Sequence, residues 1–237
     1  MPSATVKDDL LPSEKNRSYY DVIAPRYDAI LDEDAANQII RKKVEEKFIS
    51  LVKPGWVLDF GGGSGRDLEW LKNKYHIFFC EPSEGMRQKA IDLYKDPAST
   101  EKIVFLDNDK TDFTNWHLVT PFDINVEGVL ADFAVLNCIA DIELLFKNLA
   151  ALVKPGGHFV ALMLQKNYKR PLLWKIREAV RSTFSKEPLM YNTQYGVHKQ
   201  MVYVYTKAEL INAAETYFEF NSKEPLYEFN LFHFVRK

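Results

Sequence analysis

The sequence has few cysteines, almost no net charge and no long apolar run. Two of its 237 residues are cysteines, Cys80 and Cys138, which excludes a disulfide framework and a cysteine-rich zinc site. Lysine and arginine number 31 against 33 acids, so the net charge of −2 gives no general reason to bind nucleic acid or an anionic membrane. Three acids interrupt the most apolar segment, residues 129–146, and no membrane-spanning helix is expected.

The first residues lack the basic region and apolar core of a signal peptide, so we expect a cytoplasmic protein. Residues 1–16 are polar and are predicted to form a flexible leader. The whole chain is 46% apolar and of a size that suits one domain, which is expected over 17–237. Its beginning, 17–52, is expected to be a helical cap, because apolar residues recur at three- and four-residue steps over about 33–52.

Short apolar runs then alternate with helical patterns. Strands are predicted at residues 56–60, 76–80, 103–106, 126–131 and 158–164, with helices near 65–74, 83–94 and 141–153. Such crossovers favour parallel neighbouring strands with helices on both faces. The sequence therefore predicts an α/β fold with a doubly wound sheet.

The rhythm changes after residue 164. Residues 165–205, rich in tyrosine and basic side chains, are predicted to be an insertion beside the substrate, with a helix at 171–184 and a strand at 200–205. A helix at 206–216 and strands near 217–223 and 228–235 follow. The loop around Pro225 is too short for a crossover helix, so the last two strands should form an antiparallel hairpin.

The strongest chemical signal is the glycine-rich stretch after the strand at 56–60. Gly61, Gly63 and Gly65 follow the spacing G-x-G-x-G, whereas the dinucleotide fingerprint G-x-G-x-x-G would need glycine at Arg66. No Gly-Lys-Ser/Thr closes the turn, so a pyrophosphate ligand is disfavoured. The carboxylate of Asp59 before the turn suits a cationic ligand. The alternative is a plain turn that binds nothing.

Acidic residues also follow the next two strands. Glu81 stands 20 residues after Gly61, where a carboxylate can accept both hydroxyl hydrogens of a ribose, or it is an exposed loop glutamate. Asp107 and Asp109 follow the strand at 103–106, and one of them could accept a hydrogen bond from adenine N6. A solvated turn is the alternative for this pair.

Taken in order, these passages resemble the class I S-adenosylmethionine (SAM)-dependent methyltransferases. The matching passages are VLDFGGGSG, FFCEPSEGMRQKA, FLDNDKTDF, GVLADFAVLNCIAD and LAALVKPGGHFVALML, with YYDVIAPRYDAI resembling the tyrosine-bearing opening helix of small-molecule members. The resemblance covers residues 19–164 clearly. It implies a Rossmann-like, mostly parallel seven-stranded sheet with a C-terminal antiparallel hairpin. It also implies methyl transfer from SAM to a small molecule by in-line displacement.

The resemblance also implies roles for individual residues. Asp59, Gly61 and Gly63 would line the methionine moiety, with Asp59 near its amino group, and Glu81 would hold the ribose. Met86 would pack on adenine, or it packs only within its helix. Asp109 matches the adenine-contacting acid better than Asp107, although Lys110 replaces the usual small residue. Asp132 and Phe133 would lie near the sulfonium, and Asn137-Cys138 replaces a pair of histidines common in relatives.

Acceptor specificity is expected in the opening helix and the insertion. The expected pocket residues are Tyr19, Tyr20, Tyr27, Tyr168 and Tyr195. His198 is the one histidine of the insertion and the candidate general base. Seven basic residues between 165 and 187 could favour an anionic acceptor, or they form a solvated helix face. The five histidines lack the spacing of a zinc motif, and no metal is expected.

Other functions stay open. An RNA or protein methyltransferase would need a basic stripe at the pocket mouth, and a non-catalytic module would bind the cofactor without turnover. A nicotinamide dehydrogenase is disfavoured by the glycine spacing. No nucleic acid or membrane partner is expected, and the sequence does not indicate the oligomeric state.

Overall fold

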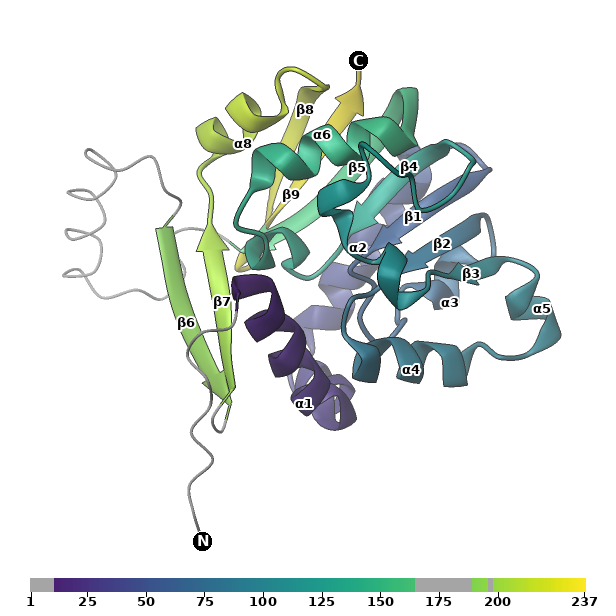
Figure 1. Cartoon of the computed structure of the whole chain (residues 1–237), viewed down its shortest axis with the longest axis vertical. Helices are drawn as coiled ribbons and strands as arrows, with labels where there is room; N and C mark the ends of the chain where they lie inside the picture. The colour runs from purple at the N-terminus through teal and green to yellow at the C-terminus, as the bar shows by residue number, and fades with distance from the viewer. Residues whose placement is uncertain (1–10, 165–188, 196–197) are drawn as a thin grey trace, which may run out of the picture.

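The computed structural model describes residues 11–164, 189–195 and 198–237. A seven-stranded sheet forms its centre, with the strand order β3-β2-β1-β4-β5-β9-β8 (Figure 1). The strands are β1 (Trp56–Phe60), β2 (His76–Cys80), β3 (Ile103–Phe105), β4 (Val126–Ala131), β5 (Val153–Leu164), β8 (Phe218–Leu226) and β9 (Phe229–Arg236). The strands β1 to β5 are parallel, and β9 and β8 add an antiparallel hairpin. The predicted α/β architecture is confirmed.

The strand order reverses between β1 and β4, and this switch point is where doubly wound sheets bind ligands. In register, Asp59 of β1 pairs with Leu130 of β4 and with Phe79 of β2. The carboxyl ends of these three strands therefore lie side by side. The residues that follow them, 61–65, 81–83 and 132–134, are brought to one edge of the sheet.

Helices cover both faces of the sheet. They are α1 (Pro12–Asp32), α2 (Ala36–Leu51), α3 (Leu68–Leu71), α4 (Glu84–Leu93), α5 (Pro97–Thr100), α6 (Ile142–Leu152) and α8 (Lys207–Ala214), with the 3-10 turns η1 (Asn108–Lys110), η2 (Phe113–Asn115) and η3 (Val135–Cys138). Helix α1 begins at Pro12, so part of the expected leader is helical. The helix expected near 65–74 has only four residues, because Gly65 adopts a left-handed conformation that a helix cannot include.

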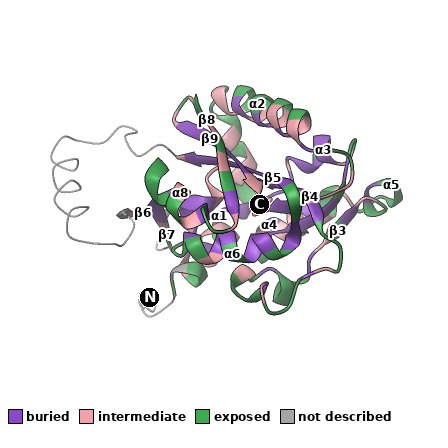
Figure 2. Cartoon of the chain, turned by 90° about the horizontal axis from the view of Figure 1, so that it is seen from above, coloured by how far each residue is buried: buried purple, intermediate pink, exposed green. Residues whose placement is uncertain are grey.

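Two apolar cores lie on opposite faces of the sheet. Ile40, Val44 and Phe48 of α2 are fully buried against one face, at the three- and four-residue steps of the sequence pattern. On the other face Leu145 and Phe146 of α6 are fully buried. Figure 2 shows the sheet mostly coloured as buried, whereas α2 carries exposed residues on its outer side.

A separate two-stranded sheet packs against α1 (Figure 1). It pairs β6 (Leu189–Tyr195) with β7 (His198–Val204) in antiparallel register. The strand expected at 200–205 is confirmed as β7, but β6 was not predicted. The helix expected at 171–184 lies outside the described residues. Asn16 of α1 joins this two-stranded sheet, called the lobe below, to the main body. Its side-chain nitrogen donates to the Met201 carbonyl at 3.1 Å, and its side-chain oxygen accepts from the Met201 N–H at 2.6 Å.

A chain of three polar side chains, centred on the buried His233, crosses the hairpin edge of the sheet. A bulge in β8 aims the Asn221 amide oxygen at His233 Nδ1, 3.1 Å away, and His233 Nε2 lies 3.0 Å from His158 Nδ1. Because the amide oxygen can only accept, the His233 proton resides on Nδ1 and His158 donates to Nε2. Burial, together with a smaller effect of His158, lowers the pKa of His233 to about 4.

The hydrogen-bonded side chains Asn221, His233 and His158 predict how the stability of the protein depends on pH. An unfolded histidine takes up a proton near pH 6.5, whereas His233 in the fold does so near 4, so stability is complete above 6.5 and is lost as the pH falls toward 4. We expect His233→Leu to be less stable at pH 7.5 but to lose on the order of 1 kcal/mol less than the wild type on going to pH 5, after allowance for solvent screening. Urea unfolding at both pH values measures this, and equal losses in the two proteins would contradict it.

Candidate functional site

The turn after β1 needs its glycines for two different physical reasons. Gly61, Gly63 and Gly65 have left-handed φ angles of 74°, 58° and 83°. A Cβ at Gly62 would lie 2.3 Å from the Phe79 ring and 2.5 Å from Asp59 Oδ2. The Gly61 N–H donates to the Cys80 carbonyl at 2.7 Å, which fastens the turn to β2. The backbone thus closely surrounds the Asp59 carboxylate.

Two buried carboxylates at this edge have one oxygen each without a hydrogen-bond partner. Within the described residues, Asp59 Oδ2 and Asp132 Oδ2 accept no hydrogen bond, although both side chains are almost fully buried. Burial raises the pKa of both carboxyls well above the usual value, and the neighbouring Asp67 raises both further. An unpaired buried acceptor costs free energy, so the arrangement is suited to a ligand that carries a donor or a positive charge.

Glu81 lies at the end of β2 and is already partly satisfied by the backbone. Its carboxylate accepts from the Ser83 N–H at 2.7 Å and from the Gly63 N–H at 2.9 Å. Burial raises the pKa of Glu81 to about 7, while these two hydrogen bonds act in the opposite direction. Glu81 therefore joins the glycine turn to β2, and its charge depends on pH near neutrality.

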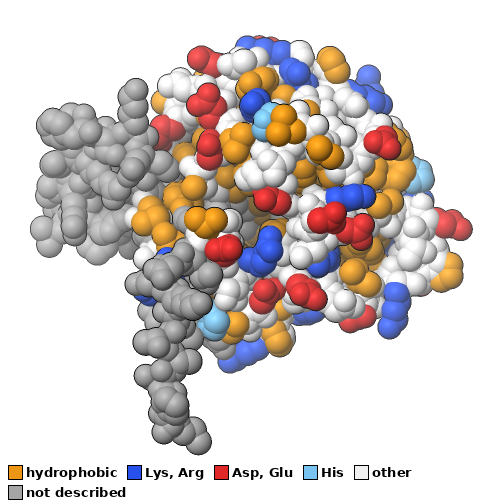
Figure 3. Space-filling view, in the orientation of Figure 1, with side chains coloured by type: hydrophobic (Ala, Val, Ile, Leu, Met, Phe, Trp, Pro, Cys, Tyr) orange, Lys and Arg blue, Asp and Glu red, His pale blue; other side chains and the backbone are white. Residues whose placement is uncertain are grey.

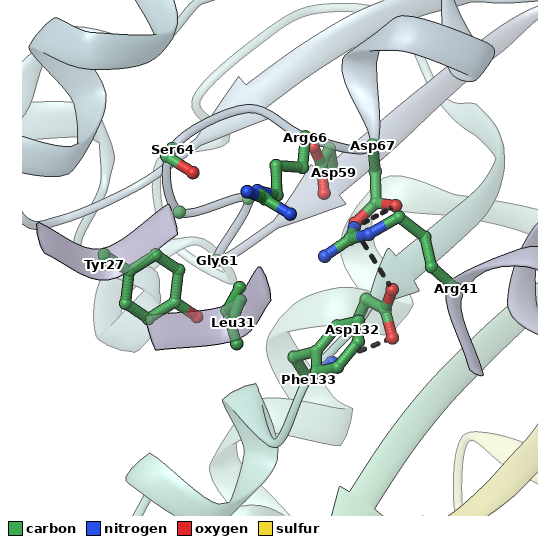
Figure 4. A pocket seen from close by; sticks show the side chains of 12 residues that line it. Tyr27, Leu31, Arg41, Asp59, Gly61, Ser64, Arg66, Asp67, Asp132 and Phe133 are labelled. Carbon is green, nitrogen blue, oxygen red and sulfur yellow. Dashed lines mark hydrogen bonds and ion pairs between the residues drawn. The ribbon is translucent and has the colours of Figure 1, made fainter. Parts of the chain in front are cut away.

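A partly buried arginine, Arg41 of α2, faces these acids (Figure 4). Its Nη1 lies 2.5 Å from Asp67 Oδ1 and 3.7 Å from Asp132 Oδ2. Its guanidinium also lies over the Phe133 ring, 4.6 Å from the centroid. Burial opposes the charged form, but Asp67 and Asp132 outweigh it and raise the pKa of Arg41. The site therefore presents one fixed cation among buried carboxylates.

Sequence reasoning missed both Arg41 and Asp67. Arg41 stands among the exposed charges of α2, beside Lys42 and Lys43, and its neighbours in the sequence do not mark it as a site residue. Its spacing was the available signal, because positions three and seven residues later, Val44 and Phe48, are buried. A cation on the buried face of an amphipathic helix needs a carboxylate partner.

Helix α1 covers the crevice. Tyr27 and Leu31 line a cavity of about 30 Å³ over the glycine turn, together with Arg41, Asp59, Asp132 and Phe133 (Figure 4). That volume holds about one water molecule. Asp28 fastens the helix by accepting from Ser64 at 2.5 Å, Arg66 at 2.9 Å and Lys89 at 2.6 Å. A ligand over the turn therefore requires Tyr27 or its helix to move.

The predicted site residues fall into three groups. Asp59, Gly61, Gly63, Asp132, Phe133 and Tyr27 line one cavity, which Glu81 borders through its bond to Gly63. Met86 is buried and packs with Ile23 and Ala24 of α1. The residues placed elsewhere or not described are Asp107 and Asp109, both exposed at η1; Tyr168, outside the described residues; and Tyr195, of which only the backbone is described.

The chain after β4 is strained. Phe133 and Ala134 have φ angles of 46° and 68°, a left-handed conformation that costs free energy in residues other than glycine. The bend leads directly into η3.

The predicted base His198 of β7 lies beside the N-terminal half of α1, where its Nδ1 is 3.1 Å from Ser18 Oγ.

Within the part of the chain that the structure describes, no helix is long and apolar enough to cross a membrane. No group of three or more histidine, cysteine, aspartate or glutamate side chains in the same ranges is placed to hold a metal ion. Cys80 and Cys138 are both free thiols.

A comparison with protein-family models identifies the family of the chain. A family model described as a methyltransferase domain matches residues 31–217. No curated protein sequence matches the chain significantly. Similar solved structures include a complex of DhpI with SAH, at 16% identity over 94% of this chain and 96% of that chain, with a TM-score of 0.63.

Two further structures have a similar fold. Magnesium protoporphyrin IX methyltransferase from Synechocystis PCC 6803, with bound SAM, is 13% identical over 98% of this chain and 100% of that chain, with a TM-score of 0.64. A SAM-dependent methyltransferase from Clostridium acetobutylicum ATCC 824 is 14% identical over 92% and 99%, with a TM-score of 0.61. At these identities the likeness establishes the fold alone.

Substitutions of Gly62, Gly63 and Gly156 should separate the cost of backbone strain from the cost of steric crowding. Gly63→Ala and Gly156→Ala each place a side chain at a left-handed position with nothing closer than 3.8 Å, so each should cost about 1 kcal/mol of unfolding free energy. Gly62→Ala should cost about 3 kcal/mol, because its Cβ would displace the buried Phe79 or Asp59 side chain. Urea denaturation gives the ranking, and equal losses for all three variants would contradict the packing around Gly62.

Proposed function

The chain belongs to the methyltransferase-domain family and is a SAM-dependent class I methyltransferase; on that basis we propose that it methylates a small-molecule acceptor. The observation that carries the assignment of the crevice is the pair of buried carboxylate oxygens beside the glycine turn that accept no hydrogen bond. SAM presents an ammonium and a sulfonium, which are the charges that such acids stabilise. A diphosphate would be repelled there.

The methionine end of SAM is a zwitterion, and the crevice carries both opposite charges. We assign its amino group to Asp59, with Asp132 and Phe133 beside the sulfonium. Arg41 is the side chain we assign to its carboxylate, because it is a cation that lines the same cavity as Asp59. Gly61 and Gly63 permit close approach by the backbone.

The nucleoside end is assigned to the tips of β2 and β3. Glu81 is proposed to accept hydrogen bonds from both ribose hydroxyls, with its carboxylate already oriented by Ser83 and Gly63. Met86 is proposed to pack on adenine. Asp109, or Asp107 in the alternative assignment, is proposed to accept from adenine N6, and both are solvent-accessible at η1.

The reaction needs alignment more than bond activation by the protein. When bound, SAM supplies a methyl group already activated by the positive sulfur. The tips of β1 and β4 would hold that group in line with the acceptor, and α1 would exclude water by covering the crevice. His198 stays the candidate general base, at the end of the lobe that packs against α1.

The tyrosine side chains of α1 support the proposal of a small-molecule acceptor. Tyr19, Tyr20 and Tyr27 form edge-to-face aromatic contacts, with centroid distances of 5.4 and 6.1 Å, and offer a compact apolar wall. On the face in Figure 3, the described lysines and arginines are interspersed with acids and do not gather in a stripe, which weakens the case for an RNA acceptor. Two free thiols support the proposed cytoplasmic location.

Calorimetry with SAM and NAD tests the proposal. We expect SAM to bind and NAD not to bind. Because Glu81 must be ionised to accept both ribose hydrogens and its pKa is about 7, wild-type affinity for SAM should be about tenfold weaker at pH 6 than at pH 8. Glu81→Gln should bind SAM at least tenfold more weakly at pH 8, with a flatter dependence on pH.

The comparison between the two proteins matters, because Asp59 and Asp132 add their own dependence on pH. If Glu81→Gln binds within about twofold of the wild type, the ribose assignment is wrong. If NAD binds in place of SAM, the whole proposal is wrong.

A ligand pair tests Arg41 separately. Arg41→Gln should lose at least tenfold in affinity for SAM but less than twofold for decarboxylated SAM, which lacks only the carboxylate. Both ligands carry the amino group, so the altered charge near Asp67 and Asp132 affects both equally. Equal losses for the two ligands would show that Arg41 only supports the acids, and circular dichroism would check that the variant folds.

A further inference from the structure

Three uncharged polar side chains from distant parts of the sequence meet beside the crevice. They are Tyr20 of α1, Cys138 of η3 and Gln200 of β7, called here the polar triad. Gln200 Nε2 donates to Tyr20 Oη at 2.7 Å. Cys138 Sγ lies 3.6 Å from the same Gln200 nitrogen and 3.7 Å from Tyr20 Oη.

The triad lies on the acceptor side of the proposed cofactor crevice. Cys138 closes η3, which starts directly after the strained bend at Phe133 and Ala134. Glu81 raises the pKa of both Tyr20 and Cys138, which places the triad within electrostatic range of the proposed ribose carboxylate. Tyr20 also contacts Tyr27, which lines the cavity over the glycine turn.

The fold has other means of joining these three elements. Asn16 joins α1 to β7 through both backbone groups of Met201 and donates to the Cys138 carbonyl at 3.0 Å. Asn137 joins η3 to β7 by donating to the Tyr203 carbonyl at 2.7 Å. Buried polar side chains are costly. The triad is therefore not needed to fix the junction, and recognition of a ligand accounts for it better.

The charges in and around the triad limit the class of acceptor that can bind there. Burial is the main cause that raises the pKa of Tyr20 and of Cys138, so both remain protonated at neutral pH. Although the pKa values of Asp59 and Asp132 are raised, the positive charges of bound SAM favour the ionised forms of both. With Glu81 and Asp67 these acids then outnumber Arg41 and the single net positive charge of SAM. A carboxylate or phosphate on the acceptor would be repelled. The basic segment at 165–187 suggested an anionic acceptor, but it lies largely outside the described residues.

The directions of the hydrogen bonds in the triad distinguish an acceptor hydroxyl from an acceptor amine. Tyr20 Oη accepts from Gln200, so its own hydrogen is directed away from that amide, either to Cys138 Sγ at 3.7 Å or to a ligand. Sulfur is a weak acceptor, so a ligand oxygen at ordinary hydrogen-bond distance would take this hydrogen. A neutral hydroxyl oxygen has two lone pairs, so it can accept this hydrogen bond and still attack a methyl carbon. A neutral amine has one lone pair, and accepting the hydrogen bond would block the attack.

We propose that Tyr20, Cys138 and Gln200 hold the reacting group of the acceptor, and that this group is the hydroxyl of an uncharged aromatic compound. The inference rests on the proposed methyltransferase function. In the transfer the carbon–sulfur bond breaks with its electron pair kept by sulfur, a carbon–oxygen bond forms, and the hydroxyl proton passes to His198, the candidate general base. The tyrosine rings of α1 are the wall for the aromatic ring.

Three compounds on one ring system test the proposal: 2-naphthol, 2-naphthylamine and 2-naphthoate. With the full chain and SAM labelled in its methyl group, we expect transfer to naphthol at least tenfold faster, in kcat/KM, than to the other two. Tyr20→Phe and Gln200→Leu should each lower kcat/KM for naphthol at least tenfold, while calorimetry shows SAM affinity within twofold of the wild type.

Asn16→Ala is the matched control, because it removes hydrogen bonds at the same junction, to the backbone of Cys138 and Met201, and leaves all three side chains of the triad in place. It should lower the melting temperature but keep the preference for naphthol over naphthoate. A preference for naphthoate or naphthylamine, or no transfer to naphthol by protein that binds SAM, would overturn the proposal. Protein that fails to bind SAM would instead overturn the proposed function on which it rests.

Discussion

Unbalanced negative charge at the switch point of the sheet is the constraint on which the rest of the site depends. Asp59, Asp67 and Asp132 converge there from three segments, and one partly buried arginine opposes them. Parallel register forces this convergence, because the ends of β1 and β4 are neighbours. Solvent cannot reach the carboxylates to stabilise them, and only a cation or a proton can. The need for a positively charged ligand is therefore built into the topology.

Helix α1 resolves the apparent conflict between a cofactor site and a cavity of about 30 Å³. The helix is fastened mainly through Asp28 and Asp32, which pair with Arg66 and Lys89 at partly exposed positions. Ion pairs of this kind contribute only about 1 kcal/mol or less each, so they can be exchanged for contacts with a ligand. The sheet edge beneath is rigid by comparison. The covering element is thus the part whose movement costs least.

The sequence predicted best where local pattern and physical cause coincide. The strand before residues 61–65 and the acids at its tip follow from apolar runs and glycine spacing, and the structure places them together. Arg41 was missed because its partners, Asp67 and Asp132, are 26 and 91 positions away, and only folding brings them near. Strand β6 was missed because Asn192, Thr193 and Gln194 break its apolar pattern; its stability comes from pairing with β7.

The two halves of the site differ in what determines them. The donor half is made of backbone turns and carboxylates at strand tips, which any chain with this sheet order can present. The proposed acceptor half is a junction of α1, η3 and β7, in which single side chains such as Gln200 would decide the chemistry. Similarity to solved structures at 13–16% identity establishes the fold and does not identify the acceptor. Recognition of the acceptor has to be inferred from this junction, where hydrogen-bond direction and local charge select among nucleophiles.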